Sequence, residues 1–370
     1  MGAAACHNVA RRGARVLAIE QFAIGHSNGS SHGHSRVIRQ AYFEHPDYVP
    51  LLLRTYELFE ELEQRCGSQL LLRCGALYGG RADSDVVAGS RLAAERHGIP
   101  HEMFDAAAIR TRFPQFALPD DHVALFEPGA GCVRAEATTH AHVQLARADG
   151  AVVLEQTCVR AWSADDHGVH VTTGQETFHG RQLIVTAGPW SARVFAEHSI
   201  PLLVTRQPMI WLGHTDHRQR ERHAMDQLPV WLIDHHDGTS VYGIPFDERL
   251  GGPAGMKVAL HGGGGPFDPE ASDRQVAAGE IAAARHAASA VLPNVSDTVL
   301  GSALCLYTCT PDQHFIIDRL PGSPRVSIAC GFSGHGFKFA PVVGEVVTDL
   351  ALRGTTQLPI GFLGMSRFYR

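Results

Sequence analysis

The sequence predicts a two-domain α/β protein, in which a Rossmann-like domain is joined to a β-rich domain. Three observations predict it. The chain begins with a helix followed by a buried strand, residues 205–263 contain several strands, and residues 326–338 contain an apolar strand followed by a glycine loop. This alternation of helices with strands is typical of α/β folds, and 370 residues are enough for two domains.

The composition excludes several classes of protein. With 44% hydrophobic and 19% charged residues, the chain is an ordinary globular protein, and its net charge of −6 offers no basic surface for nucleic acid. It contains no apolar run of about 18 residues for a membrane span and no secretory signal. The eight cysteines form no CxxC pair and the histidines are scattered. We therefore expect reduced thiols, a cytoplasmic location and no metal site.

The N-terminal segment resembles the middle of a dinucleotide-binding βαβ unit. Residues 2–11 are rich in alanine and predict a helix, and residues 15–19 predict a strand that ends at Glu20. In such units an acidic residue about twenty residues beyond the glycine fingerprint binds the ribose hydroxyls. Gly2 then corresponds to the third glycine of G-x-G-x-x-G, and the first Rossmann strand is missing. We therefore expect that the start of the chain is incorrectly assigned. The alternative is that these residues are an isolated helix and strand with no role in nucleotide binding.

The next elements alternate between helix and strand. Residues 26–42 predict a polar loop that runs into a helix, on which Arg36 and Arg39 share a face. Helices are then expected at 48–64, 82–97 and 135–147, and strands at 70–72, 76–78, 124–129, 131–133, 151–159, 168–171 and 183–186. The small residues after 186, with Ala187 and Gly188, predict a turn through which backbone passes close to a nucleotide.

The second half of the chain is β-rich before it returns to α/β order. Strands are expected at 209–212, 230–233, 240–244 and 257–260, and a helix at 274–292. This order predicts a nucleotide domain that a substrate-binding domain interrupts twice. We assign residues 1–72, 137–204 and 299–370 to the first domain, and residues 73–136 and 205–298 to the second.

The segment from Cys305 to Lys338 is the most informative. Residues 331–338, Gly-Phe-Ser-Gly-His-Gly-Phe-Lys, follow an apolar strand and precede a helix. Glycines in such a loop let backbone N–H groups approach a ligand, and the helix directs its positive end towards it. Together with Cys305, His335 and Lys338, this predicts a redox cofactor beside an anionic substrate.

These segments together resemble the monomeric sarcosine oxidase and N-methyltryptophan oxidase family of flavin amine oxidases, over nearly the whole chain. The matches are N-G-S-x-H-G-x-x-R-x-I-R at 28–39, Y-G-x-P at 242–245, K-x-x-x-H at 257–261, C-x-Y-T at 305–308, D-x-x-F-I-I-D at 312–318 and the glycine loop at 331–338. Each pattern is weak alone, but all of them occur in order.

The resemblance implies FAD, bound covalently through the sulfur of Cys305. From the residues alone a buried apolar thiol is the commoner reading of a cysteine, and Cys309 is the competing attachment point. The resemblance also implies a set of cofactor-binding positions: Gly2, Glu20, Ser31, His32, Val159, Ala187, Gly188, Gly334, His335 and Gly336.

The resemblance further implies the residues that bind and transform the substrate. Arg39 and Lys338 correspond to the pair that binds its carboxylate, which orients the N-methyl carbon towards the flavin. Tyr242 and His261 correspond to positions that shape the pocket around the amine. Lys257 corresponds to the lysine that activates oxygen by its positive charge, and Arg36 to an arginine that supports the reduced flavin. The loop at 246–255 could act as a lid.

The activity implied is the oxidation of a secondary N-methyl amino acid by a monomeric enzyme, with O₂ as the acceptor and sarcosine or N-methyltryptophan as the substrate. Two alternatives stay open. A flavin dehydrogenase would pass the electrons to another acceptor, although Lys257 would then be superfluous. In the other, the truncated chain binds no flavin and is inactive.

Overall fold

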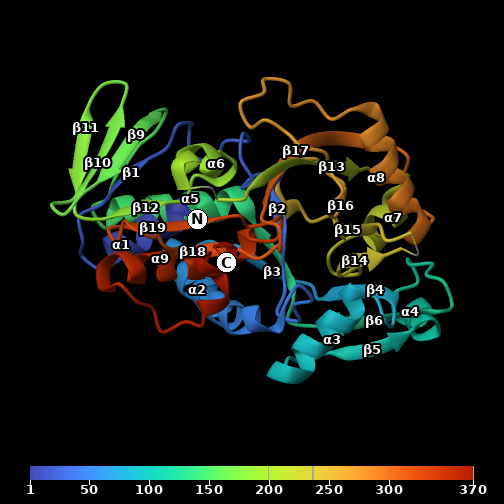
Figure 1. The fold of residues 1–370 in the computed structure, drawn as a ribbon. Coiled ribbons are helices and arrows are strands. Elements are labelled where there is room, and N and C mark those ends of the chain that lie inside the picture. Colours follow the sequence, from blue (N-terminus) through green and yellow to red (C-terminus); the bar gives the residue numbers. More distant parts are fainter. Residues whose placement is uncertain (199, 236, 370) are drawn as a thin grey trace.

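The computed structural model describes residues 1–198, 200–235 and 237–369, which form two parts lying side by side (Figure 1). One part contains most of the long helices and several short sheets. The other is built on a single eight-stranded sheet. Both chain termini lie in the helical part (Figure 1).

Three helices pack together at the centre of the helical part. The N-terminal helix α1 (Gly2–Arg11) contacts both α5 (Ala135–Ala148) and α9 (Ala340–Arg353). Small residues allow this close approach: a Cβ atom at Gly344 would lie 2.6 Å from the backbone of Ala4. The longest helix, α2 (Val49–Cys66), packs against α9 and ends at Gly67 in the left-handed conformation.

Short sheets complete this part. Strand β1 (Leu17–Ile19) pairs in parallel with β8 (Val152–Leu154). A second sheet joins β12 (Leu183–Val185) in parallel to β19 (Val326–Cys330), which pairs antiparallel with β18 (Ile316–Arg319). The third is an antiparallel sheet at the surface, formed by β9 (Val159–Ala164), β10 (Val169–Thr173) and β11 (Thr177–Gly180).

The eight-stranded sheet has the order β17-β13-β16-β15-β14-β4-β6-β5. Its pairs are antiparallel except for the parallel pair of β14 and β4. The strands span Val299–Cys309 (β17), Leu203–Leu212 (β13), Met256–Leu260 (β16), Ser240–Ile244 (β15), Val230–Asp234 (β14), Ala76–Arg81 (β4), His122–Glu127 (β6) and Glu102–Asp105 (β5). Strand β17 therefore belongs to this sheet, although we had assigned residues from 299 onwards to the nucleotide domain.

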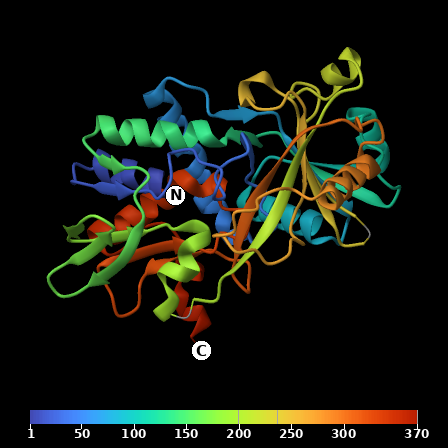
Figure 2. The ribbon, with the colours of Figure 1, turned by 90° about the horizontal axis from the view of Figure 1, so that it is seen from above.

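The two faces of this sheet differ because side chains alternate along each strand. One face carries Ile210, Trp231, Ile233, Val241 and Val258, which form a core with Ala284, Ala288 and Val291 of α8 (Ala278–Val291). Seen from above, α8 lies on the outer side of the sheet (Figure 2). The other face is turned towards the helical part and carries the polar residues described below.

A small sheet between the two parts corrects one prediction. Residues 35–38 form strand β2 (Ser35–Ile38) instead of entering a helix, and β2 pairs with β7 (Gly131–Arg134), which also pairs with β3 (Leu71–Arg73). Arg36 and Arg39 therefore do not share a helical face. The β-branched pair Val37 and Ile38 favours a strand, and sheet partners distant in sequence decide it.

Three strands differ from the prediction: residues 151–159 form parts of two strands, β8 and β9, instead of one, β13 begins at Leu203 instead of 209, and the long strand β17 was not expected. The remaining predicted helices and strands occur within a few residues of their expected bounds. Helix α3 (Asp85–His97) begins at the Ser84 cap. The helices α4 (Ala106–Arg112), α6 (Ser191–Val194) and α7 (His217–Arg222) and the strands β5, β11 and β18 were not expected. They are short elements of the kind that periodicity detects poorly.

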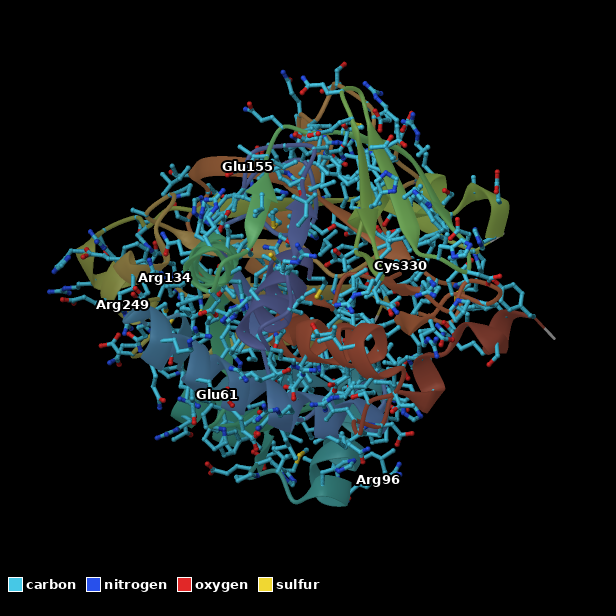
Figure 3. All side chains as sticks on the ribbon, turned by 90° about the vertical axis from the view of Figure 1, so that its left-hand side faces the viewer. Glu61, Arg96, Arg134, Glu155, Arg249 and Cys330 are labelled. Atoms are coloured by element: carbon cyan, nitrogen blue, oxygen red, sulfur yellow. The ribbon has the colours of Figure 1, made fainter. Side chains whose placement is uncertain are left out.

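The side view contrasts exposed and buried side chains. Exposed Arg96 and Arg249 lie towards the rim of the side view, whereas Cys330 of β19 is buried (Figure 3).

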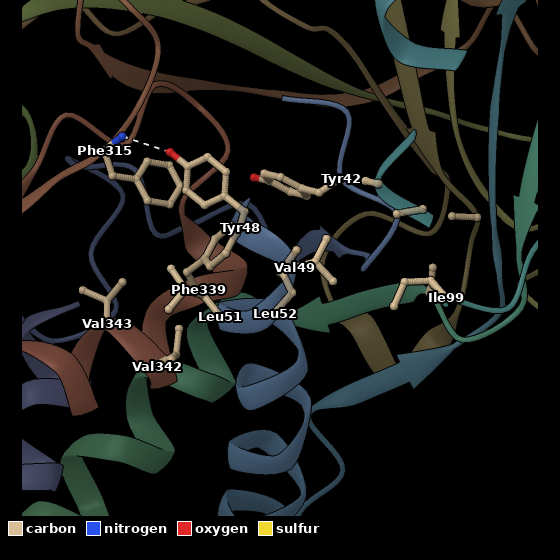
Figure 4. Close-up of a cluster of buried hydrophobic side chains, with 14 of the residues drawn as sticks. Tyr42, Tyr48, Val49, Leu51, Leu52, Ile99, Phe315, Phe339, Val342 and Val343 are labelled. Carbon is tan, nitrogen blue, oxygen red and sulfur yellow. Dashed lines mark hydrogen bonds between the residues drawn. The ribbon is translucent and has the colours of Figure 1, made fainter. Parts of the chain in front are cut away.

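The largest buried cluster joins α2, α9 and the C-terminal loop (Figure 4). Tyr42, Tyr48, Phe315 and Phe339 pack in it with ring centroids 4.8–5.4 Å apart, and the hydroxyl of Tyr48 accepts a hydrogen bond from the Phe315 N–H. No helix in the described ranges is both long enough and apolar enough to cross a membrane.

Candidate active site

Three predicted site residues lie on the same face of the eight-stranded sheet. Tyr242 is two residues from Ile244, which stands directly opposite Lys257 on the neighbouring strand. Lys257 in turn stands opposite Trp211 of β13. Cys305 stands opposite Gln207, which is also on β13 and four residues before Trp211. Because opposite residues and residues two apart point to one side, Tyr242, Lys257 and Cys305 face the helical part together.

Lys257 and Arg36 are two buried cations that meet at this face. Lys257 Nζ donates to the carbonyl oxygens of Gly33 (3.0 Å) and Ser35 (2.6 Å). Arg36 donates to the carbonyls of Ser35 and Ser30. Among the described residues neither cation has a carboxylate within ion-pair distance. Burial, and then the nearby Arg36, lower the pKa of Lys257 well below its usual value.

Cys305 lies beside Arg36, whose Nη2 donates to the sulfur at 3.3 Å. The competing Cys309 points to the same face two pleats further along β17, at the end of the strand. Burial raises the pKa of the Cys309 thiol. Cys305 is therefore the cysteine that stands next to the buried cations, and the thiolate form of Cys309 is disfavoured.

Arg39, just after β2, binds a carboxylate in this structure. Both carboxylate oxygens of Glu44 lie 2.7 Å from its Nη2, and the arginine side chain is only 5% exposed. The guanidinium lies 4.3 Å from the ring centroids of both Tyr42 and Phe43. Burial disfavours the charged form of Glu44, but Arg39, assisted by His335 and Lys338, outweighs it and lowers the pKa of Glu44 to about 2.

Lys338 is the second cation of this group. Its Nζ donates to the carbonyl oxygen of His335 (2.7 Å) and to the hydroxyl of Tyr42 (3.4 Å). Burial, and then Arg39, lower the pKa of Lys338 to about 7, although Glu44 opposes this. Arg39 thus binds the Glu44 carboxylate directly, and Lys338 lies near enough to lower the pKa of that carboxyl.

His261, just beyond β16, lies between this group and the sheet. Its Nδ1 is 3.5 Å from the hydroxyl of Tyr307, and its ring meets that of Phe43 edge-on. Burial lowers the pKa of His261, so the ring is neutral at physiological pH, and burial raises the pKa of Tyr242 to about 12. Both groups are uncharged polar groups among the buried charges of this site.

The residues predicted to contact the dinucleotide lie at the ends of α1, β1 and β12. Gly2 begins α1, whose first turn has no side-chain cap, and Glu20 directly follows β1. Ala187 and Gly188 follow β12; Gly188 has φ +54°, and no atom lies within 4 Å of where its Cβ would be. Val159 begins the surface strand β9 and is 39% exposed.

Two loops complete the set. Ser31 and His32 lie before β2 in a loop whose Gly33 and His34 N–H groups donate to the Glu136 carboxylate. Gly334, His335 and Gly336 lie between β19 and α9, and Gly334 has φ +82° with the Tyr307 ring where a side chain would be. The side chain, the backbone N–H and the carbonyl oxygen of His335 are all engaged by protein partners.

These residues fit a flavin dinucleotide. An uncapped helix terminus suits a diphosphate, and Glu20 suits the ribose hydroxyls. Among the described residues, the buried nitrogen Nε2 of His32 and the hydroxyl of Thr308 have no hydrogen-bond partner, and Arg36 and Lys257 have no carboxylate partner, so the two cations suit an anionic group. Within the described residues no cluster of three or more His, Cys, Asp or Glu could hold a metal.

The sequence analysis missed Tyr42, Glu44 and Tyr307. Glu44 follows Arg39 by five residues, yet nothing in that spacing predicts that a loop turns the two side chains towards each other. Tyr307 lies in the C-x-Y-T motif at 305–308, but the motif by itself assigns it no role. Tyr307 is two residues from Cys305, so both side chains point to the same face of β17. A prediction of residues 299–309 as a strand would have shown this.

Comparison with known proteins places this arrangement in a family context. Residues 1–350 match the family described as FAD dependent oxidoreductase. The monomeric sarcosine oxidase of Streptomyces avermitilis is 43% identical over 99% of this chain and 95% of its own length. The N-methyl-L-tryptophan oxidase of Salmonella arizonae is 33% identical over 100% of this chain and 96% of its own.

Solved structures agree at the level of the fold. An amino acid oxidase essential for nikkomycin biosynthesis superimposes with a TM-score of 0.84 at 23% identity, covering 98% of this chain and 94% of that one. The L-proline dehydrogenase from P. horikoshii gives 0.83 at 22% identity, covering 100% and 95%.

Proposed function

We propose, on the premise that this chain belongs to the FAD-dependent oxidoreductase family, that it oxidises a secondary N-methyl amino acid. The overall reaction converts the N-methyl amino acid, O₂ and water into the amino acid, formaldehyde and hydrogen peroxide. FAD, when bound, accepts the hydride from the substrate and passes both electrons to O₂. Side chains of this protein bind the substrate and stabilise the charges that develop during the reaction.

The observation that carries the proposal is the carboxylate bound to Arg39, with the buried amine of Lys338 close enough to lower the pKa of that carboxyl. Glu44 occupies this position with its own carboxylate, which supports a pocket shaped and charged for that group. A substrate carboxylate would replace Glu44, and the substrate amine would then lie towards the neutral groups of His261, Tyr242 and Tyr307. A neutral, partly apolar setting lowers the pKa of a bound amine, which leaves its lone pair free.

Lys257 and Arg36 would act on the other reactant. Both cations are buried without a carboxylate partner in the described part of the chain, so they can stabilise negative charge that develops nearby. In a site of low polarity such fixed charges act strongly, because little water screens them. We assign Lys257 to the reduction of O₂ and Arg36 to the support of the reduced cofactor.

Cys305 is the proposed point of covalent attachment. Its sulfur is buried on the same sheet face as Lys257 and beside Arg36. The names of the relatives suggest sarcosine or N-methyltryptophan as the substrate. We further propose a monomeric enzyme of the cytoplasm, where the eight free cysteines would stay reduced.

The test separates the cofactor from the chemistry. The purified protein should be yellow and stay yellow after acid precipitation, which indicates covalent FAD. Anaerobic mixing with sarcosine or N-methyltryptophan should bleach the flavin, and O₂ should restore the colour rapidly and release peroxide. Slow reoxidation by O₂ would instead indicate a dehydrogenase, and a colourless folded protein would refute the proposal.

Lys257→Met tests the division of roles between the two half-reactions. Removing the charge should slow reoxidation by O₂ by at least about 100-fold, on the scale of a lost electrostatic stabiliser. Anaerobic reduction by the substrate should change by less than about fivefold. Equal losses in the two stopped-flow measurements would contradict the assignment. Lys257→Arg, which keeps the charge, is the matched control.

A further inference from the structure

Tyr42 and His335 form a buried hydrogen-bonded pair directly behind Lys338. Tyr42 Oη lies 2.6 Å from His335 Nδ1, and the two residues are 0% and 5% exposed. Tyr42 comes from the loop after β2 and His335 from the glycine loop before α9, so the pair joins the two segments that carry Arg39 and Lys338. The function proposed above gives no role to either side chain.

The direction of each hydrogen bond follows from the partners. His335 Nε2 lies 2.9 Å from the carbonyl oxygen of Gln313, which can only accept, so Nε2 carries the proton. Burial keeps the ring neutral, because it lowers the pKa of His335 to about 3. Nδ1 is then an acceptor, and because Tyr42 Oη lies only 2.6 Å from it, the hydroxyl donates its one hydrogen to Nδ1 in preference to the carbonyl oxygen of His335 at 3.3 Å.

This fixes what remains for Lys338. With its hydrogen committed, Tyr42 Oη can only accept, and it does so from Lys338 Nζ at 3.4 Å. A second hydrogen of Nζ goes to the carbonyl oxygen of His335 at 2.7 Å. An ammonium group has three hydrogens, so one is left for a ligand.

The ring of Tyr42 also connects the two cations. Its centroid lies 4.3 Å from the Arg39 guanidinium and 5.0 Å from Lys338 Nζ. Both distances are within the range of favourable cation–π contacts. The same side chain therefore sets the place of Arg39 through its face and the orientation of Lys338 through its hydroxyl.

We propose that Tyr42 and His335 are positioning residues, which hold Lys338 so that its one free hydrogen is directed at the carboxylate of the substrate. The pair acts through Lys338 and does not itself touch the substrate. The inference rests on the proposed function in one respect, since it takes the ligand of Arg39 and Lys338 to be a carboxylate.

The experiment measures the binding of acetate to the flavin-loaded enzyme, by the change in flavin absorbance. Tyr42→Phe keeps the ring but removes the hydroxyl, and should weaken binding about three- to tenfold, the effect of one lost hydrogen bond. Tyr48→Phe is the matched control. Tyr48 belongs to the same aromatic cluster, but its hydroxyl accepts from the Phe315 N–H (Figure 4) and forms no hydrogen bond with Lys338 among the described residues.

A double-mutant cycle shows whether the effect passes through Lys338. If it does, Tyr42→Phe should add nothing to the loss caused by Lys338→Met. Additive losses, or an equal loss in Tyr48→Phe, would overturn the proposal. If Lys338→Met itself binds acetate normally, Lys338 does not bind the carboxylate, and the proposed function fails. This outcome is distinct from the additive losses that would overturn only the positioning role of Tyr42 and His335.

A second measurement is made on the wild-type protein, and a variant serves only to assign the signals. ¹⁵N spectra of histidine-labelled wild-type protein, with His335→Gln used for assignment, report the tautomer of His335. We expect a neutral ring protonated at Nε2, with Nδ1 as a hydrogen-bond acceptor. A proton on Nδ1, or a charged ring near pH 7, would overturn the order of hydrogen bonds on which the proposal depends.

Discussion

At the scale of single residues, two buried lysines differ in what surrounds them. Lys257 donates to two backbone carbonyls and has Arg36 as its charged neighbour, whereas Lys338 lies beside Arg39 and the Glu44 carboxylate. A cation without a counter-ion can stabilise charge that arises only during a reaction. A cation beside a carboxylate group is suited to binding one. The same residue type therefore has two different proposed roles.

The state of Lys338 should make ligand binding depend on pH. Its pKa of about 7 means that the amine is charged below pH 7 and loses its charge above it. The groups facing it are Tyr42, His335, Arg39, Glu44 and His261. Acetate should thus bind more weakly as the pH rises from 6 to 8, measured by titration of the flavin spectrum. In Lys338→Arg, which stays charged, this dependence should disappear; if it persists, another group is responsible.

Glu44 should compete with the substrate. Glu44→Gln removes the internal carboxylate, so acetate should bind several-fold more tightly in the same titration. The free energy of unfolding should fall by about 2 kcal/mol, because Arg39 loses a buried ionic partner. Glu61→Gln, on an exposed pair with Arg11, is the control and should change neither quantity. Unchanged or weaker acetate binding in Glu44→Gln would contradict the competition.

At the scale of elements, the contact between α1 and α5 contains a buried pair of histidines. His7 Nδ1 lies 3.0 Å from His142 Nδ1, and Arg65 Nη1 lies 2.6 Å from the other nitrogen of His7. Burial, and then Arg65, lower the pKa of His7 to about 4, and burial lowers the pKa of His142 well below its usual value. Both rings are neutral where two helices cross.

This pair should make the fold sensitive to acid. In the unfolded chain both histidines take up a proton near pH 6.5, whereas in the folded protein they resist it, so stability falls as the pH falls from 6.5 towards 4. For His7 alone the loss approaches about 3 kcal/mol. Urea unfolding at several pH values should show a flatter dependence in the double variant His7→Gln/His142→Gln.

The matched control for this prediction is the cross-strand pair His170 and His179, whose Nδ1 atoms are 2.7 Å apart at the surface. Replacing both with Gln should leave the wild-type pH dependence, because these rings reach solvent. If the surface variant flattens the dependence as much as the buried one, the α1–α5 contact is not its source.

At the scale of the whole molecule, the proposed cofactor site depends on both parts of the protein. The eight-stranded sheet contributes Cys305 and Lys257, and the helical part contributes Gly2 and Glu20. A ligand held by both parts stabilises the folded state by mass action. In Cys305→Ser, which cannot form the covalent bond, FAD would bind reversibly.

The melting temperature of apo Cys305→Ser should therefore rise with added FAD. At 100 times the dissociation constant the gain is about 2.7 kcal/mol. The wild-type enzyme, already flavinylated, should not respond to added FAD. A melting temperature of the variant that does not respond to FAD would show that the chain lacks a cofactor site, and flavin that stays attached after denaturation would move the attachment to Cys309.

The fold class, the family and most of the candidate residues could be predicted from the sequence. These depend on local signals: an alanine-rich helix, an acidic residue after a strand, and a glycine loop between a strand and a helix, all of which short-range sterics and hydrogen bonding impose. Even the cysteine beside the buried cations, Cys305, was chosen from its motif.

Only the tertiary structure decided how these residues meet. It placed Arg36 in a strand, because partners about 100 residues away pair with it, and it joined Glu44 to Arg39 through the course of a loop. It also revealed the bonds of Tyr42 to His335 and to Lys338 across almost 300 residues. Such contacts depend on long-range packing and on burial, which raises the cost of an unpaired polar group, and no local pattern in the sequence records them.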